Sequence, residues 1–445
     1  MRAPVCEFAR RYAESDPLRL HMPGHKGMGP MGVERLDLTE IEGADVLYAP
    51  QGILRESQEN ASRLFGSAKT LYSTEGSSLS IRAMLYLALL WGKERGRSPR
   101  ILAARNVHRS FVSAAALLDV EVEWLFSECG TLLSCPLRAE TVERTLSGME
   151  ELPVALYLTS PDYLGNIADL RALSEVCHRH GVLLLVDNAH GAYLHFLPEP
   201  SHPLDLGADL CCDSAHKTLS ALTGTGYLHI SKGAPALLSE LAERAMALFA
   251  STSPSYLLLQ SLDGLNSSLE GDYPRLLAAF AERTEALKRR LTAMGYTPVG
   301  QEPLKLTLDT KAYGYRGTDL ARILSLSGIV CEFSDRDFLT AMLSPQIGEE
   351  GLRRLETALL EIPRRAPLWE PMPPMPHRPE RALSIRDAML CGGTVCAVED
   401  SVGKILADAA LSCPPAVPIL VCGERITEEA ARCFAYFGIT HLRTV

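Results

Sequence analysis

The sequence predicts an α/β fold in which a mostly parallel sheet is covered by helices on both faces, followed by a small α+β domain. Two observations support this prediction. Between about residues 60 and 235, apolar runs of strand length alternate with segments of helical period, as is typical of a buried parallel sheet. The chain has 445 residues, which is too many for one hydrophobic core.

The first elements define a large domain. Strands are expected at 100–106, 120–126, 154–160 and 182–190, and helices at 78–96, 109–119 and 169–181. The long helical stretch 258–295 is expected to break between Gly271 and Pro274. We therefore expect an N-terminal segment at 1–60 and a large domain at 61–295.

A second group of elements predicts the small domain. Strands are expected at 304–310, 328–335 and 338–345, and helices at 317–328 and 348–362. They predict an α+β domain at 296–363. The prolines of 364–380 exclude helix and central strand and indicate a linker, so that a C-terminal domain is expected at 381–445.

Composition excludes several classes of protein. The net charge of −10 argues against nucleic acid as the main partner, because phosphate binding needs a basic face. The twelve cysteines form no CxxC pair, which favours reduced thiols in the core and predicts no metal site. The N-terminus lacks an apolar signal core, and the longest apolar run, 83–91, is too short to span a membrane. We expect a soluble cytoplasmic protein.

Polar residues follow the expected strands at 105–110, 159–163, 187–191 and 213–218. Ligands of parallel sheets bind beyond the carboxyl ends of the strands, so these four segments predict one crevice. Three of these segments also have a plainer interpretation. Lys217 could be a surface lysine and His108 a structural histidine, while Asp187 could cap the next turn.

A further segment, at 73–78, predicts an anion site. Gly76 permits a tight turn, and Ser77 and Ser78 stand where a helix begins, although they could equally be plain helix caps. Pyridoxal phosphate needs a lysine, an anion site, a carboxylate for its ring nitrogen and a group that stacks on its ring. Lys217, the 76–78 turn, Asp187 and His108 supply all four, so the sequence predicts this cofactor.

The same segments resemble the Orn/Lys/Arg decarboxylase family, in its short form, and the resemblance covers nearly the whole chain. It rests on HMPGHKG (21–27), DLTEIEGAD (37–45), STEGSS (73–78), RNVHRS (105–110), TSPDYLGN (159–166), VDNAHGAY (186–193), DSAHKTL (213–219) and CPPAVPILVCGE (413–424). The resemblance implies fold type I of the pyridoxal-phosphate enzymes, the aspartate-aminotransferase fold. It also implies a homodimer or higher homo-oligomer, with segment 1–60 near the dimer interface.

The resemblance assigns a role to each candidate residue. Lys217 would hold the cofactor as an internal aldimine, Asp187 would bond the pyridine nitrogen and His108 would stack on the ring. The other cofactor-binding residues implied are Gly76, Ser77, Ser78, Ala189, His190, Ser214 and His216. This chain departs from the family pattern at Val46, Glu75, Asn188 and Gly224.

The implied activity is decarboxylation of a basic amino acid through an external aldimine and a quinonoid, giving the amine and CO₂, as in polyamine biosynthesis. Acidic residues would bind the distal cation of the substrate, and the candidates are Glu332, Asp335 and Glu424, which could also be solvated surface acids. Arginine is the first choice, followed by lysine and ornithine. Two alternatives stay open: another reaction on the same fold, such as an aminotransferase or lyase, and a weakly active homologue with a regulatory role.

Overall fold

The computed structural model describes residues 1–126, 134–376, 378–408 and 417–445. The chain divides into two compact units. The first comprises Met1–Pro99, Glu143–Tyr157 and Leu170–Arg275, and the second comprises Arg100–Val142, Leu158–Asp169 and Leu276–Val445. Each unit is therefore assembled from separate stretches of the chain. The linear domain boundaries expected from the sequence stay a prediction.

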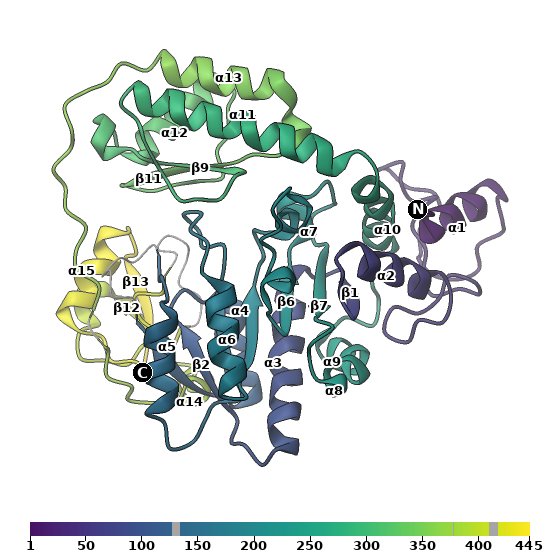
Figure 1. The fold of residues 1–445 in the computed structure, drawn as a ribbon, viewed down its shortest axis with the longest axis horizontal. Helices are drawn as coiled ribbons and strands as arrows, with labels where there is room; N and C mark the ends of the chain where they lie inside the picture. The colour runs from purple at the N-terminus through teal and green to yellow at the C-terminus, as the bar shows by residue number, and fades with distance from the viewer. Residues whose placement is uncertain (127–133, 377, 409–416) are drawn as a thin grey trace. The chain divides into compact units, whose positions relative to one another are not determined.

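The first unit is built on strands in the order β1-β7-β6-β5 (Figure 1). Their bounds are β1 (Lys69–Ser73), β5 (Leu183–Asp187), β6 (Leu210–Asp213) and β7 (Gly226–Ile230). Strand β7 runs antiparallel to both of its neighbours, whereas β5 and β6 are parallel, so three of these strands point the same way. Every residue of β5, β6 and β7 is buried, so helices and loops cover both faces. The predicted fold class is confirmed.

Helices complete the first unit. They are α1 (Pro4–Glu14), α2 (Ile53–Leu64), α3 (Gly76–Glu94), α6 (Leu170–Arg179), α7 (Ala215–Thr218), α8 (Ala236–Glu240), α9 (Ala242–Phe249) and α10 (Tyr256–Glu270), with the 3-10 turns η1 (Ala192–Phe196) and η2 (Pro203–Leu206). Helix α3 packs along β1, β5, β6 and β7, because its apolar residues occupy most of its circumference. It begins earlier than the sequence predicted, at Gly76.

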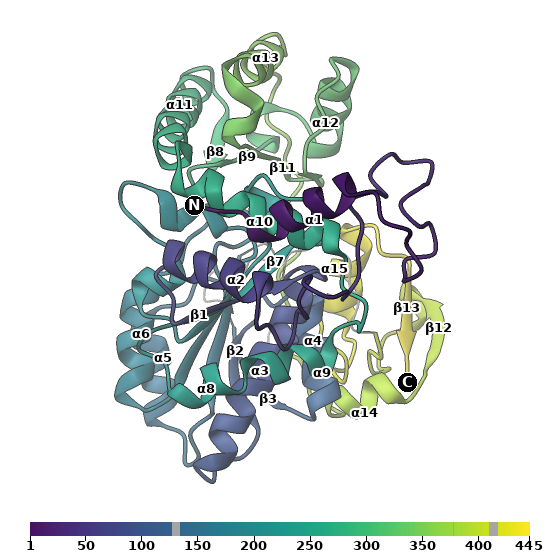
Figure 2. The ribbon, with the colours of Figure 1, turned by 90° about the vertical axis from the view of Figure 1, so that its right-hand side faces the viewer.

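Helices α1, α2 and α10 lie side by side (Figure 2). A buried carboxylate joins them: Asp263 of α10 accepts hydrogen bonds from the Cys6 main-chain N–H at 2.9 Å and from Ser57 Oγ at 2.5 Å. Burial raises the pKa of the Asp263 carboxyl, and its two donors act against that rise. The N-terminal helix is thus fixed to the unit by a polar contact as well as by apolar packing.

The second unit begins with the parallel pair β2 (Arg100–Ala104) and β3 (Glu121–Leu125), which helix α4 (Arg109–Leu118) connects. These three elements were predicted, and their identities are confirmed. Helix α5 (Ala139–Ser147), strand β4 (Ala155–Thr159) and helix α11 (Tyr273–Ala293) each run along the chain from one unit into the other. The predicted break in the long helix is confirmed, because α10 ends at Glu270 and α11 begins at Tyr273.

An antiparallel sheet of order β10-β11-β9-β8 forms the small α+β part of the second unit. Its strands are β8 (Thr297–Val299), β9 (Lys305–Asp309), β10 (Phe333–Ser334) and β11 (Phe338–Met342), and its helices are α11, α12 (Gly317–Leu326) and α13 (Gly348–Leu360). The helices lie over one side of the sheet in both views (Figures 1 and 2). The strand predicted at 328–335 is wrong over most of its length. Its Val330 is exposed, so apolar character alone was misleading there.

The C-terminal part of the second unit holds helix α14 (Ile385–Leu390), the antiparallel pair β12 (Thr394–Ala397) and β13 (His441–Thr444), and helix α15 (Glu428–Tyr436). The short 3-10 turns of the second unit are η3 (Lys311–Tyr313), η4 (Pro345–Ile347) and η5 (Val398–Asp400). The described residues of the predicted linker, 364–376 and 378–380, form neither helix nor strand. Residues 413–416, the first four of the family segment 413–424, lie outside the described residues.

The ten cysteines that the structure describes are all free, and six of them are buried. Burial raises the pKa of Cys177 to about 12 and that of Cys422 to about 12, so these thiols stay protonated. Within the described ranges, no helix combines the length and the apolar character that a membrane span requires.

Gly317 provides a test of the packing in the second unit. A Cβ at this position would overlap the main-chain oxygen of Phe338 and lie 2.6 Å from its carbonyl carbon. These are backbone atoms of β11 and cannot move aside cheaply, so we expect Gly317→Ala to lower the free energy of unfolding by about 1–3 kcal/mol. Urea denaturation of the purified protein measures this change.

Gly233→Ala is the matched control, because the nearest atom to its Cβ would be Ser231 Oγ at 3.9 Å. Its effect should stay within about 0.5 kcal/mol. Equal stability of the two variants would contradict the close approach of α12 to β11.

Candidate active site

Lys217 lies on α7, the short helix that follows β6. Its Nζ is 3.1 Å from Nε2 of His190, which follows β5. Because β5 and β6 are parallel neighbours, their carboxyl ends meet at one edge of the sheet, and this edge brings the two residues together. The side chain of Lys217 is exposed, while Ala215 and Thr218 of the same helix are buried. The segment therefore holds its backbone in the core and presents the amine outward.

Asp187 is the last residue of β5 and is almost completely buried. Its carboxylate accepts hydrogen bonds from the Ala189 N–H at 3.2 Å, Tyr157 Oη at 3.4 Å and Cys212 Sγ at 3.5 Å. Burial and the nearby carboxylate raise the pKa of both Tyr157 and Cys212, which keeps these donors neutral. In the described part of the chain, no cation pairs with Asp187. A buried carboxylate with weak neutral donors is suited to a cationic N–H from a ligand.

The turn between β1 and α3 approaches the turn between β6 and α7. Ser214 Oγ donates to Ser77 Oγ at 3.0 Å, so two of the predicted phosphate residues are together. The idea that Ser77 and Ser78 cap the helix is wrong: Glu75 is the cap residue, and both serines stand in the first turn of α3. First-turn amides have no partner within their helix and lie at its positive end, which suits an anion.

Two glycines join this turn to the loop between α7 and β7. Gly76 has φ +63 and donates its N–H to Gly224 O at 2.7 Å. Gly224 has φ +99, and a Cβ there would lie 3.1 Å from Leu258 Cδ1, which explains glycine at this departure from the family pattern. His216 Nδ1 donates to Thr225 O at 2.7 Å, which fixes the remaining predicted phosphate residue to the same loop.

Glu75 is the departure that places a carboxylate next to the anion site. Its Oε1 accepts a hydrogen bond at 2.7 Å from the N–H of Ser251, in the segment after α9. The negative charge is thus engaged by a separate segment of the first unit. This contact removes the main electrostatic objection to an anion at the start of α3.

His108 belongs to the second unit, where it caps α4. Its Nδ1 accepts a hydrogen bond at 3.2 Å from the Ser110 N–H and lies 2.9 Å from Ser110 Oγ. Its ring is exposed at the exit of β2. The capping bond supports the structural interpretation, and the stacking role stays a prediction.

The three predicted substrate acids also belong to the second unit and differ in their surroundings. Glu332 is exposed. Asp335 is buried, and its Oδ1 accepts from the N–H groups of Asp337 at 2.7 Å and Phe338 at 2.6 Å. Burial raises the pKa of Asp335 to about 6, and its Oδ2 has no hydrogen-bond partner among the described residues.

Glu424 is fully engaged within the second unit. Its two carboxylate oxygens accept from Arg105 Nη1 at 2.7 Å and Nη2 at 2.5 Å, and Oε2 also accepts from the Val421 N–H at 2.7 Å. Neither side chain is exposed appreciably. This bidentate pair neutralises Glu424, which makes it a poor partner for a second cation.

The sequence did not single out a buried group behind Lys217 and Asp187. It consists of Asn188, His202, Asp213 and His229, all of which are fully buried. The available signal was that Asp213, like Asp187, ends a buried strand and therefore needs partners.

Solved structures with the same arrangement identify the fold. The constitutive lysine decarboxylase of Escherichia coli superposes with a TM-score of 0.79 at 19% identity, over 100% of this chain and 82% of that one. The structure of SPT with a pyridoxal-phosphate internal aldimine gives a TM-score of 0.53 at 13% identity, over 69% of this chain and 75% of that one. The fold is therefore shared with pyridoxal-phosphate proteins.

Sequence comparison narrows the class. The model of the Orn/Lys/Arg decarboxylase major domain matches residues 3–299, and the arginine decarboxylase of Bacillus subtilis is 30% identical over 96% of this chain and 91% of its own. The chain belongs to the Orn/Lys/Arg decarboxylase family.

The Arg105–Glu424 pair gives a test of the second unit. Glu424→Gln leaves the buried guanidinium of Arg105 without a counter-charge, so we expect it to lower the free energy of unfolding by about 3–5 kcal/mol. The measurement is urea denaturation at neutral pH.

Glu380→Gln is the control. Glu380 pairs at 2.9 Å with Arg425, the residue after Glu424, and this pair lies on the exposed surface. Its unfolding midpoint should match that of the unaltered protein. A loss of the same size in both variants would contradict the special role of the buried pair.

Proposed function

We propose that the protein is a pyridoxal-phosphate-dependent decarboxylase of a basic amino acid. The observation that carries the proposal is the pairing of Lys217 Nζ with His190 Nε2 at 3.1 Å beside Asp187, a buried carboxylate without a cationic partner in the described chain. Membership of the Orn/Lys/Arg decarboxylase family supports the same activity.

The residues of the first unit fit the cofactor. Asp187 would hold the ring nitrogen in its protonated form, since it needs the cationic donor that this nitrogen provides. Ser77, Ser78, Ser214 and His216 would hold the phosphate at the start of α3, where helix geometry favours an anion. Lys217 would bind the aldehyde group, and Gly76 and Ala189 would supply the close backbone around it.

Bound pyridoxal phosphate supplies a ring that withdraws electrons from the substrate Cα. The chain itself must manage protons. Lys217 Nζ and His190 Nε2 are within the range of direct proton transfer. One of them can therefore donate a proton to Cα of the substrate and then receive a proton from the other. Which bond at Cα breaks would depend on how the residues of the chain hold the substrate.

Arginine is the substrate we propose first, because the arginine decarboxylase of Bacillus subtilis is similar to nearly the whole chain. Lysine and ornithine follow. Glu332 and Asp335 are proposed partners of the distal cation, and Glu424 is the weakest of the three predicted acids because Arg105 occupies both of its oxygens. The stacking role of His108, a cytoplasmic location and a homodimer are parts of the same proposal that rest on the family resemblance.

Replacement of Lys217 tests the proposed activity. Purified protein supplied with pyridoxal phosphate should release CO₂ from arginine, lysine or ornithine and form the corresponding amine. Lys217→Ala should reduce CO₂ release to background and remove the visible absorbance of the bound cofactor, because no other described amine would take its place.

Lys232→Ala serves as the control, since Lys232 is an exposed lysine of the same unit and should be dispensable. A keto-acid product without CO₂ would identify an aminotransferase instead. Absence of cofactor binding by the unaltered protein would refute the enzyme and favour a regulatory homologue.

A further inference from the structure

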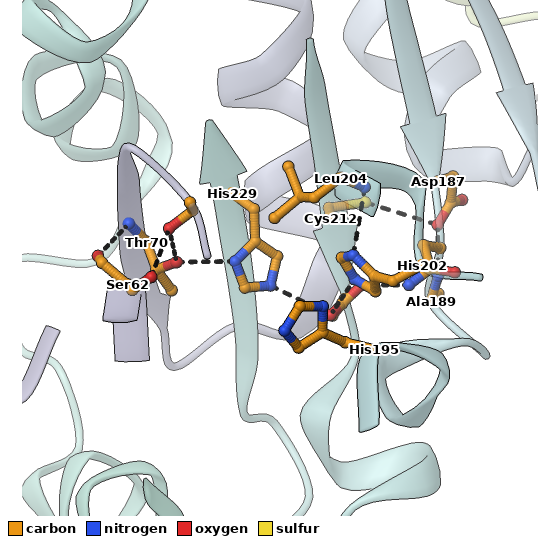
Figure 3. Close-up of polar contacts among 12 residues, drawn as sticks. Ser62, Thr70, Asp187, Ala189, His195, His202, Leu204, Cys212 and His229 are labelled. Atoms are coloured by element: carbon orange, nitrogen blue, oxygen red, sulfur yellow. Dashed lines mark hydrogen bonds and ion pairs between the residues drawn. The ribbon is translucent and has the colours of Figure 1, made fainter. Parts of the chain in front are cut away.

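A fully buried polar group lies behind the carboxyl ends of β5 and β6. Figure 3 shows His202 and His229 turned towards one another, with Asp187 and Cys212 on the adjoining strands. Asp213 Oδ2 is 3.1 Å from Nε2 of both histidines, and its Oδ1 accepts from Asn188 Nδ2 at 2.6 Å. One carboxylate therefore gathers three side-chain donors from three different segments.

The protonation of this group follows from its other contacts. His202 Nδ1 accepts from the Leu204 N–H at 3.3 Å, so its proton lies on Nε2 and points at Asp213. Burial lowers the pKa of His229, which stays neutral and faces the Thr70 hydroxyl with Nδ1 at 2.8 Å. Burial acts to raise the pKa of Asp213, but His202 and His229 outweigh it and lower that pKa. Asp213 is thus an anion held by side-chain hydrogen bonds.

A metal site is the obvious alternative, because ligand atoms of His202, Cys211 and Asp213 lie within 4.8 Å of one another. Coordination through His202 Nε2 would move the ring proton to Nδ1, where it would meet the Leu204 N–H instead of accepting from it. Burial also raises the pKa of the Cys211 thiol well above its usual range. The contacts fit a hydrogen-bonded anion better than a metal centre.

The position of the Asn188–Asp213 bond gives it a consequence for the active site. The Asn188 N–H donates to Cys212 O at 2.9 Å, which is the last main-chain contact between the two strands before they diverge. Beyond it, one strand continues to His190 and the other to Lys217. The side-chain bond therefore ties the two loops at their base, two residues before His190 and four residues before Lys217.

We propose that Asn188 and Asp213 are a positioning pair that sets the relative placement of Asp187 and His190 on one loop and of Ser214 and Lys217 on the other. The inference rests on the proposed function for its effect on the cofactor. It also accounts for the amide at 188, where the family pattern has an acid, because an acid would face Asp213 across 2.6 Å in the core.

A charge-swap experiment tests the pair. Asn188→Asp creates two buried carboxyl groups in contact, so one must take up a proton when the protein folds. The variant should therefore lose stability relative to the unaltered protein as pH rises, by up to about tenfold in the unfolding constant per pH unit. The neighbouring Cys211, Cys212 and Tyr227 stay neutral, because burial raises the pKa of each, so they do not supply the change.

Cofactor affinity separates positioning from mere stability. At pH 6 and at temperatures where Asn188→Asp is folded, its dissociation constant for pyridoxal phosphate should be about 10-fold to 100-fold higher, as is usual when a residue that orients direct ligands is changed. The double variant Asn188→Asp/Asp213→Asn reverses the polarity of the bond and should recover both the affinity and the flat pH dependence.

Three outcomes would overturn the proposal. They are unchanged affinity in folded Asn188→Asp, a double variant as impaired as the single one, and a stoichiometric metal ion in the purified protein. If the unaltered protein fails to bind pyridoxal phosphate, the proposed function falls separately. The pair is then tested in the cofactor-free protein by the rate at which Lys217 is acylated relative to Lys232. This ratio should change in Asn188→Asp and should return to its original value in the double variant.

Discussion

The burial of one carboxylate at the end of each of two parallel strands is the constraint on which the first unit depends. Asp187 ends β5 and Asp213 ends β6, and both are almost inaccessible. Two anions in the core would be very costly unless each had strong donors. Asp213 has them in Asn188, His202 and His229, whereas the donors of Asp187 are longer and include a thiol. The fold thus supplies Asp213 with short side-chain hydrogen bonds, and Asp187 keeps only longer ones.

This difference bears on how the edge of the sheet holds Lys217. The buried base of the two loops is fixed by main-chain and side-chain bonds, so only the last few residues extend towards solvent. Lys217 lies beyond this base and keeps an exposed amine. A site built from the ends of strands is held more closely than one built on a free loop, and positioning of that kind is what proton transfer over about 3 Å needs.

The sequence predicted the elements that its periodicity marks strongly, whereas the site residues at strand exits stay a prediction. Strands β2, β3, β4 and β5 and the break between α10 and α11 were predictable because long apolar runs and a proline mark them. The pair β12–β13 was missed because no residue of β12 is buried and the alternation of β13 extends over only four residues. The partners of Asp213 were missed because His202 and His229 converge only through tertiary packing, which no spacing in the sequence reveals.

The departures from the family pattern illustrate the same point. Glu75 and Gly224 lie in two turns that contact each other: the N–H of Gly76 donates to Gly224 O, and the Glu75 carboxylate accepts from the Ser251 N–H. A side chain at 224 would strain the backbone at φ +99, which explains why glycine occupies this position. The departure at Asn188 is also matched by a contact, because its amide donates a hydrogen bond to the buried Asp213 carboxylate. At Glu75, Gly224 and Asn188 the departures are therefore matched by hydrogen bonds within the first unit.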